Sequence, residues 1–195
     1  MPKHFRTPHA LVGLLVAVML TGCTGPAVVT TTPTPTVAVT PTPTGPPSLS
    51  DDDLYNLAVS QYQKLYAILT GVEKDGGAPW LPDDTRDLMM DPAYTAYGDH
   101  YMNLLFKDIQ FIGEPEYSIT AMARLDGGDL IDGTVVALQT CELFQGASVF
   151  DKDGNTLNDG TPTMNHIKAY FKYDPTDEQL KAFVVNREEI DICPF

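Results

Sequence analysis

Period-two alternation is clearest in Asn165-His166-Ile167-Lys168-Ala169-Tyr170-Phe171-Lys172-Tyr173. One face of the pattern carries Asn165, Ile167, Ala169, Phe171 and Tyr173, and the opposite face carries His166, Lys168, Tyr170 and Lys172. Alternation of this kind is typical of a strand that has one face on a core and the other toward solvent. We therefore predict a strand over residues 162–173, with His166 facing solvent.

Further strand patterns lie on both sides of this stretch. Residues 180–190 predict the last strand, after a turn at residues 174–177. Upstream, residues 111–123 alternate, residues 134–143 are β-branched and apolar as in a buried strand, and residues 147–150 predict a further short strand. Strands that follow one another with turns between them predict an antiparallel sheet.

The turn Asp151-Lys152-Asp153-Gly154-Asn155 starts like a calcium-binding loop. Its glycine comes at the fourth position, and no glutamate stands at the twelfth position. The spacing therefore favours an ordinary turn, and we expect neither a metal ion nor another cofactor.

Two helices precede the strands. Ser50 is followed by three aspartates, a typical capped helix start, and apolar residues then recur at helical spacing up to Gly71, where we predict the helix to end. Asp91 caps a second helix over residues 92–108, which places several tyrosines on one face. This order of elements predicts an α+β domain over residues 49–195, in which the N-terminal helices pack on one face of a curved antiparallel sheet.

The first 22 residues have the organisation of an export signal. A short basic head with Lys3 and Arg6 precedes an apolar run over residues 10–20, which is too short to span a bilayer. The run ends in Leu20-Thr21-Gly22-Cys23. Residues 1–23 thus resemble a bacterial lipoprotein signal of the actinobacterial type, and the resemblance implies cleavage after residue 22 and lipidation of Cys23. The competing interpretations are an uncleaved signal anchor and an ordinary secreted protein with a chance cysteine.

The segment after Cys23 is low in complexity. Threonine and proline dominate residues 23–48, and no charged residue occurs between Arg6 and Asp51. Such a segment has no apolar face to bury, so we expect a disordered, extended linker. Together with the lipid at Cys23, it would hold the domain at the cell membrane on the extracytoplasmic face.

Charge restricts the partners. The formal net charge is −14, because 26 Asp and Glu residues outnumber 12 Lys and Arg residues. An acidic surface repels nucleic acids and anionic lipid headgroups. We therefore expect no nucleic-acid partner, contact with the membrane through the lipid alone, and an envelope protein or a small ligand as the remaining partner.

Two cysteines remain once Cys23 is assigned to lipid. Cys141 and Cys193 each lie in or just after a predicted strand. Because exported chains with an even number of cysteines usually pair them, we predict a Cys141–Cys193 disulfide.

Several polar and aromatic residues of the predicted domain are candidates for lining a pocket. Gln61 interrupts the apolar stripe of the first helix, either as a buried amide bonded to backbone or as a pocket residue. Trp80, the one tryptophan, either plugs an end of the core or stacks on a ligand. Asp99 and His100 are adjacent on a helix and do not face each other, so we expect no catalytic pair there. The full candidate set is Gln61, Tyr62, Tyr66, Trp80, Tyr97, Tyr101 and Asn165.

The order of elements resembles the cone-shaped α+β superfamily of ketosteroid isomerase and nuclear transport factor, and lipoproteins of actinobacteria that carry such domains. The features that carry this resemblance are the capped first helix with its aromatic residues, Gly113, Cys141, the turn at residues 151–154 and Cys193. Enzymes of the superfamily place an aspartate base and tyrosine or acid donors inside the cone. No carboxylate is expected on an apolar face beside the tyrosines of this chain, and no catalytic motif is present.

We therefore expect a lipid-anchored domain that binds a ligand or a protein without catalysis. The alternative is a cone-type enzyme that moves a proton on a small apolar substrate, as an isomerase or a dehydratase does. A third interpretation is an accessory subunit of an envelope complex.

Overall fold

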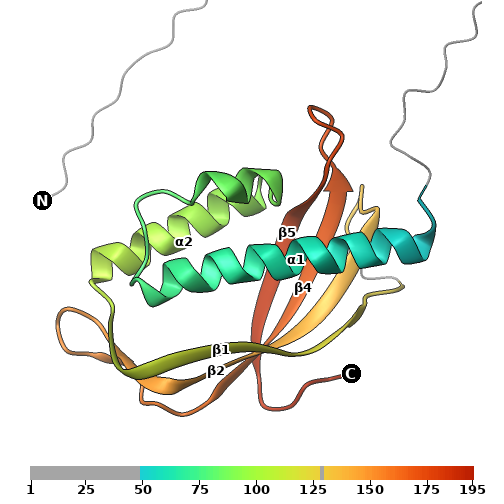
Figure 1. Cartoon of the computed structure of the whole chain (residues 1–195). Coiled ribbons are helices and arrows are strands. Elements are labelled where there is room, and N and C mark those ends of the chain that lie inside the picture. Colours follow the sequence, from blue (N-terminus) through green and yellow to red (C-terminus); the bar gives the residue numbers. More distant parts are fainter. Residues whose placement is uncertain (1–48, 128–129) are drawn as a thin grey trace, which may run out of the picture. The chain divides into compact units, whose positions relative to one another are not determined.

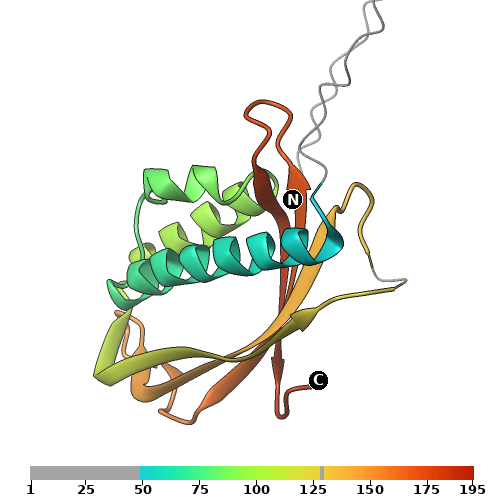
Figure 2. The ribbon, with the colours of Figure 1, turned by 45° about the vertical axis from the view of Figure 1, so that its right-hand side comes forward.

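The helices lie on one side of a single sheet (Figures 1 and 2). The computed structural model describes residues 49–127 and 130–195, and the predicted lipoprotein signal and linker lie outside these residues. The elements are α1 (Asp51–Lys74), the short 3-10 helix η1 (Asp83–Asp87), α2 (Ala93–Lys107), β1 (Gln110–Arg124), β2 (Val136–Phe150), β3 (Thr156–Asn158), β4 (Thr163–Tyr173) and β5 (Leu180–Ile190). The sheet is antiparallel in the order β1-β2-β4-β5, with β3 paired to β2, and it is not closed. The predicted α+β class is confirmed.

Helix α1 begins as the sequence predicts and ends later. The Ser50 side chain accepts a hydrogen bond from the Asp53 backbone N–H at 3.2 Å, which satisfies one of the free donors of the first turn. The predicted end at Gly71 is wrong, because the Asp75 N–H donates to the Gly71 carbonyl and continues the helical pattern. Gly71 is exposed, and a Cβ there would meet no other atom. Glycine in a helix costs about 1 kcal/mol relative to alanine, which packing of the other face offsets.

The core lies between the helices and the inner face of the sheet. Its most buried side chains are at most 2% exposed and come from the helices, the sheet and the segment before α2: Ala58, Leu65, Met89, Leu138, Ile167, Ala169, Phe171, Leu180 and Ala182. The alternation predicted for β4 holds, because Ile167, Ala169 and Phe171 all belong to this core. The two predicted segments 134–143 and 147–150 form one continuous strand, β2.

The sheet bends where β1 and β2 pass each other at two glycines. Gly113 and Gly146 both have positive φ, at 107° and 88°. A Cβ on Gly113 would lie only 2.4 Å from the Gly146 carbonyl oxygen, so this close approach excludes a side chain. The register shifts between Gly113 and Glu116, as at a β-bulge, and bulges increase the bend and twist of a strand pair.

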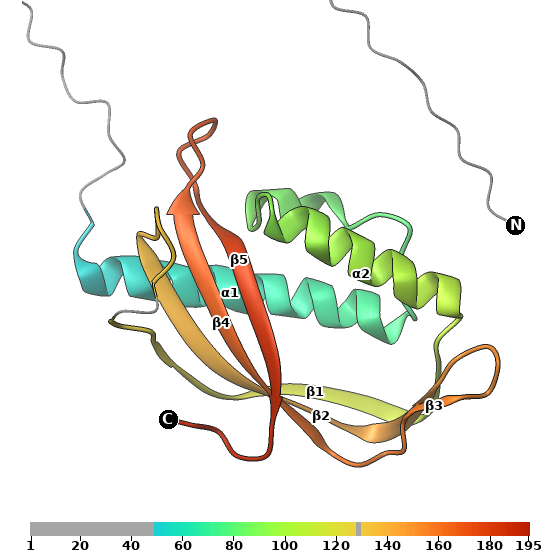
Figure 3. The same cartoon turned by 180° about the vertical axis from the view of Figure 1, so that it is seen from behind.

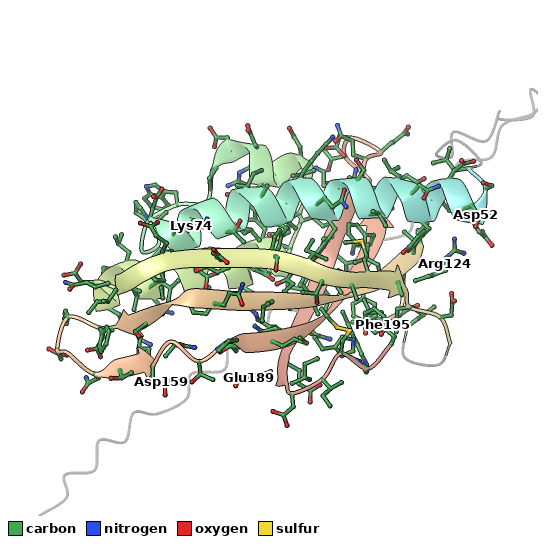
Figure 4. The ribbon with its side chains drawn as sticks, turned by 60° about the horizontal axis from the view of Figure 1, so that its bottom comes forward. Asp52, Lys74, Arg124, Asp159, Glu189 and Phe195 are labelled. Carbon is green, nitrogen blue, oxygen red and sulfur yellow. A yellow bond between two sulfur atoms is a disulfide. The ribbon has the colours of Figure 1, made fainter. Side chains whose placement is uncertain are left out.

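The C-terminal tail covers part of the outer face of the sheet, at Cys141 and His166. The predicted disulfide is confirmed, because Cys193 in the tail is bonded to Cys141, which is completely buried in β2. Phe195, labelled in Figure 4, lies with its ring centroid 5.8 Å from that of His166. His166 is therefore only 9% exposed, and the prediction that it faces solvent is wrong. The alternation correctly predicts that His166 lies on the outer face of the sheet. It does not show that the segment after β5 folds back and covers His166.

Candidate functional site

A polar cavity interrupts the core near the C-terminal end of α1. It has a volume of about 30 Å³, which is room for one water-sized group. The helix contributes Tyr62, Tyr66 and Glu73, which recur at helical spacing and so share one face. The other polar and aromatic side chains come from α2 and from four strands: Tyr97, Tyr101, Tyr117, Glu142, Phe144, Asn165 and Arg187.

A wider hollow adjoins this cavity. It has a volume of about 410 Å³, within the range of small-molecule sites. Residues of α1, of α2 and of all five strands line it, and Figure 3 shows α2 above this part of the sheet. Its apolar wall consists of Leu104, Ile109, Phe111, Phe144, Val149 and Leu157. Both spaces share Glu73, Tyr117, Phe144, Asn165 and Arg187 as lining residues, so the polar cavity lies directly beside the hollow.

The best-defined contact of the site joins α1 to β2. The Tyr62 hydroxyl donates a hydrogen bond to Glu142 Oε1 at 2.6 Å, and the two residues are only 4% and 8% exposed. Burial raises the pKa of the Tyr62 hydroxyl well above its usual value, and the nearby Glu142 carboxylate raises it further. Burial also raises the pKa of Glu142, while the bond from Tyr62 and the charge of Arg187 act in the opposite direction. Tyr62 is therefore the proton donor of this pair.

Arg187 is the cation of the site. Its guanidinium lies 3.8 Å from Glu142 Oε2, and its side chain, which lines both the cavity and the hollow, is 39% exposed. Burial lowers the pKa of Arg187, but the charges of Glu73 and then Glu142 outweigh this effect and raise it. Because the guanidinium is partly solvated, the 3.8 Å contact is a weak ion pair rather than a tight one. One guanidinium thus serves two carboxyl groups.

Glu73 is the second carboxyl group. Burial raises its pKa, whereas the charge of Arg187 and the Tyr117 hydroxyl lower it. The Tyr117 hydroxyl lies near this carboxyl group without reaching hydrogen-bond geometry. A carboxyl group with a raised pKa beside a hydroxyl and a hollow is the kind of group that binds ligands or transfers protons.

Two tyrosine hydroxyls of the cavity have no hydrogen-bond partner. The oxygens of Tyr66 and Tyr117 are buried and form no hydrogen bond with any residue that the structure describes. A buried hydroxyl without a partner costs about 1–3 kcal/mol, so most such groups in folded proteins are paired. Both hydroxyls line the cavity, where a ligand or a water molecule would pair with them.

The sequence-based candidates separate into two groups. Tyr62, Tyr66, Tyr97, Tyr101 and Asn165 come together around the cavity. Gln61 lines neither space, and its side-chain oxygen is buried without a hydrogen-bond partner. Trp80 lies on the surface and is 78% exposed, so the expectation that it plugs the core is wrong. It sits in a loop after α1 whose neighbour Leu81 enters the core in its place.

The sequence-based set lacks the charged residues of the cavity, Glu73, Glu142 and Arg187, and also Tyr117. The expectation that no carboxylate lies on an apolar face beside the tyrosines is wrong. Glu142 interrupts the apolar run of β2 in phase with Leu138, and this interruption is a signal visible in the sequence. Arg187 likewise stands two residues after Val185 in β5, so both side chains lie on the inner face, and this spacing is also visible in the sequence.

Two further features of the described residues bear on function. Neither α1 nor any other described helix combines the length and the apolar character that crossing a membrane requires. Within residues 49–127 and 130–195, no three His, Cys, Asp or Glu side chains are grouped so that they could hold a metal ion. Asp151 instead accepts hydrogen bonds from the Asn155 backbone and side chain at 2.9 Å, as in a turn.

No protein-family model and no curated protein matches this chain.

Proposed function

We propose that this chain is a lipid-anchored, extracytoplasmic protein whose domain binds a small ligand in the hollow between α2 and the sheet. The anchor is proposed on the sequence of residues 1–23 alone. Two acyl chains on Cys23 would hold the protein on a membrane stably, because each buried methylene contributes about 0.8 kcal/mol. A Cys23→Ser variant should lose all fatty-acid labelling, and undiminished labelling would contradict the anchor.

One observation carries the ligand-binding proposal. The buried hydroxyls of Tyr66 and Tyr117 have no partner among the described residues and end at a cavity that adjoins an apolar hollow of about 410 Å³. A ligand with an apolar body and a polar end would fit both spaces, because its polar end would form hydrogen bonds with the two hydroxyls and its apolar body would cover the wall of the hollow.

Filling the hollow tests this proposal. Val149 lines it, so a Val149→Trp variant should abolish the binding of small aromatic fragments. Chemical-shift changes on fragment addition, observed by NMR, measure that binding. Ile192→Trp adds the same ring on the tail at a residue that is 81% exposed, and should bind as the unmodified protein does. Fragment binding that survives in Val149→Trp would place the ligand elsewhere.

A second candidate function rests on Glu73. Its carboxyl group lines both spaces, its pKa is raised by burial, and the Tyr66 and Tyr117 hydroxyls end at the same cavity. Such a carboxylate could remove a proton from the carbon beside a ketone while the hydroxyls donate to the ketone oxygen. Deuterium exchange of 2-tetralone in heavy water, followed by NMR, tests this. If 2-tetralone exchanges no faster in the presence of the unmodified protein than without it, the catalytic function is rejected and the binding function still stands.

A further inference from the structure

The charges around the hollow do not balance. Three carboxyl groups line the cavity or the hollow, namely Glu73, Glu142 and Glu189, and Arg187 is the one guanidinium or ammonium group among the lining residues. His100 also lines the hollow, but burial and the charges of Arg187 and Lys107 lower its pKa. Histidine therefore does not supply a second positive charge at neutral pH.

Arg187 cannot neutralise both buried carboxylates. Its guanidinium lies 3.8 Å from Glu142 Oε2 and also interacts with Glu73. Glu189 lines the outer hollow and forms no ion pair with any residue that the structure describes. With all three carboxyl groups ionised, the site therefore has an excess of negative charge that a bound cation would reduce.

Aromatic rings surround this excess charge. Five tyrosines and Phe144 line the cavity. The Tyr62 hydroxyl donates to Glu142, and the hydroxyls of Tyr66 and Tyr117 have no partner among the described residues. Ring faces attract ammonium groups, and the attraction strengthens where water is excluded. The same chemistry already operates at the edge of the site, where Lys74 Nζ lies 5.7 Å from the centroid of the Tyr117 ring.

We infer that the ligand is a small organic cation, an amine whose protonated head enters the cavity beside Glu73 and whose apolar body covers the wall of the hollow. This inference rests on the proposed ligand-binding function. The cavity of about 30 Å³ accepts one water-sized group, which is the size of an ammonium head. The net charge of −14 also favours the approach of a cation over that of an anion.

Three probes with one aromatic body separate the head group from the body. Benzylamine, benzyl alcohol and phenylacetate would be titrated calorimetrically into the full-length protein in lipid nanodiscs. Benzylamine should bind about tenfold or more tightly than benzyl alcohol, and phenylacetate most weakly. Equal or tighter binding of the alcohol or of phenylacetate would overturn the cation and leave the ligand-binding function standing. Binding of none of the three would reject the ligand-binding function as well.

Removal of the Glu73 charge then tests whether the ammonium head lies beside this carboxyl group. Glu73→Gln keeps the shape of the side chain and should weaken benzylamine about tenfold while benzyl alcohol binds within about twofold of the unmodified protein. Glu188→Gln is the matched control, because it removes a carboxylate one residue from Arg187, at a residue that lines neither space. An equal loss for both probes in Glu73→Gln would show a structural role for this carboxyl group and overturn the placement. Circular dichroism would verify that both variants are folded.

Discussion

Consecutive residues of β2 meet opposite environments. Cys141 points to the outer face, where it is fully buried and bonded to Cys193, whereas Glu142 points to the inner face and accepts a hydrogen bond from Tyr62. Around Cys141 the outer face is covered by the tail, which the disulfide holds in place. On the inner side, burial raises the pKa of the Glu73 and Glu142 carboxyl groups, and the hydroxyls of Tyr66 and Tyr117 have no partner among the described residues. At this point of β2 the outer face is held by a covalent bond, whereas the inner face, which elsewhere packs against the core, carries polar groups whose burial is costly.

The disulfide should have the largest effect on stability. It closes a loop with a sequence separation of 52, which in the chain-entropy model corresponds to about 4 kcal/mol. Cys193→Ala is preferred over a change at Cys141, because Cys193 lies in the tail and leaves no cavity in the core. The variant should unfold at a lower urea concentration, with a Tm lower by on the order of 10 °C. The reduced unmodified protein should behave alike, and a variant as stable as the oxidised protein would contradict this role.

The hydrogen bond of the inner face should have the next largest effect. Tyr62→Phe removes a buried donor and leaves Glu142 with one partner fewer, so the free energy of unfolding should fall by about 1–3 kcal/mol. Tyr66→Phe is the matched change on the same helix face, and it removes a hydroxyl that has no partner among the described residues. Its stability should be unchanged or slightly higher. Equal losses in urea unfolding of the two variants would contradict the difference between the two hydroxyls.

The pH dependence of Glu142 separates the two faces further. Burial raises the pKa of Glu142 above its usual 4.5, so the folded state binds this proton more tightly than the unfolded state does. The corresponding stability is present below pH 4.5 and is lost as pH rises toward the folded-state pKa. Glu142→Gln cannot titrate, so the free energy of unfolding of the variant minus that of the unmodified protein should rise with pH across this window.

Urea unfolding in steps from about pH 4 to about pH 8 measures this difference. Removal of the hydroxyl in Tyr62→Phe eliminates a bond that lowers the pKa of Glu142, so the window should then extend to higher pH. A difference that stays flat or falls with pH would contradict a raised pKa.

The sequence predicts the elements better than it predicts the site. Strands β4 and β5 follow from alternation and turns, and the start of α1 follows from its cap, because these signals are local. Glu73 is missed because Gly71 is taken as the helix end, and the sequence does not show that packing of the opposite face carries the helix one turn further. That turn brings Glu73 to the cavity.

Contacts between distant segments account for the other differences. His166 has the predicted face, but its exposure depends on a tail that a disulfide holds over it. A lone aromatic residue in a loop, such as Trp80, carries no periodic signal from which burial could be deduced. Glu142 and Arg187 each stand in phase with apolar residues, and only their proximity in space shows that they form a site.

The smallest effect is expected where the tail covers the outer face. Burial lowers the pKa of His166, with a further contribution from Lys168, while Glu188 acts in the opposite direction. Phe195→Ala removes the ring that lies over the imidazole and is itself 42% exposed, so stability should fall by no more than about 1 kcal/mol. Water should then reach the imidazole, and its pKa should rise toward the usual 6.5.

An NMR titration of the His166 ring protons measures this rise. Ile192→Ala is the control in the same tail, since Ile192 is 81% exposed and should leave the titration unchanged. If Phe195→Ala also leaves it unchanged, the disulfide alone holds the cover in place. If the pKa rises, the aromatic end of the tail and the disulfide close the outer face together, because the bond at Cys141 fixes the position of the tail and the Phe195 ring excludes water from the neighbouring strand.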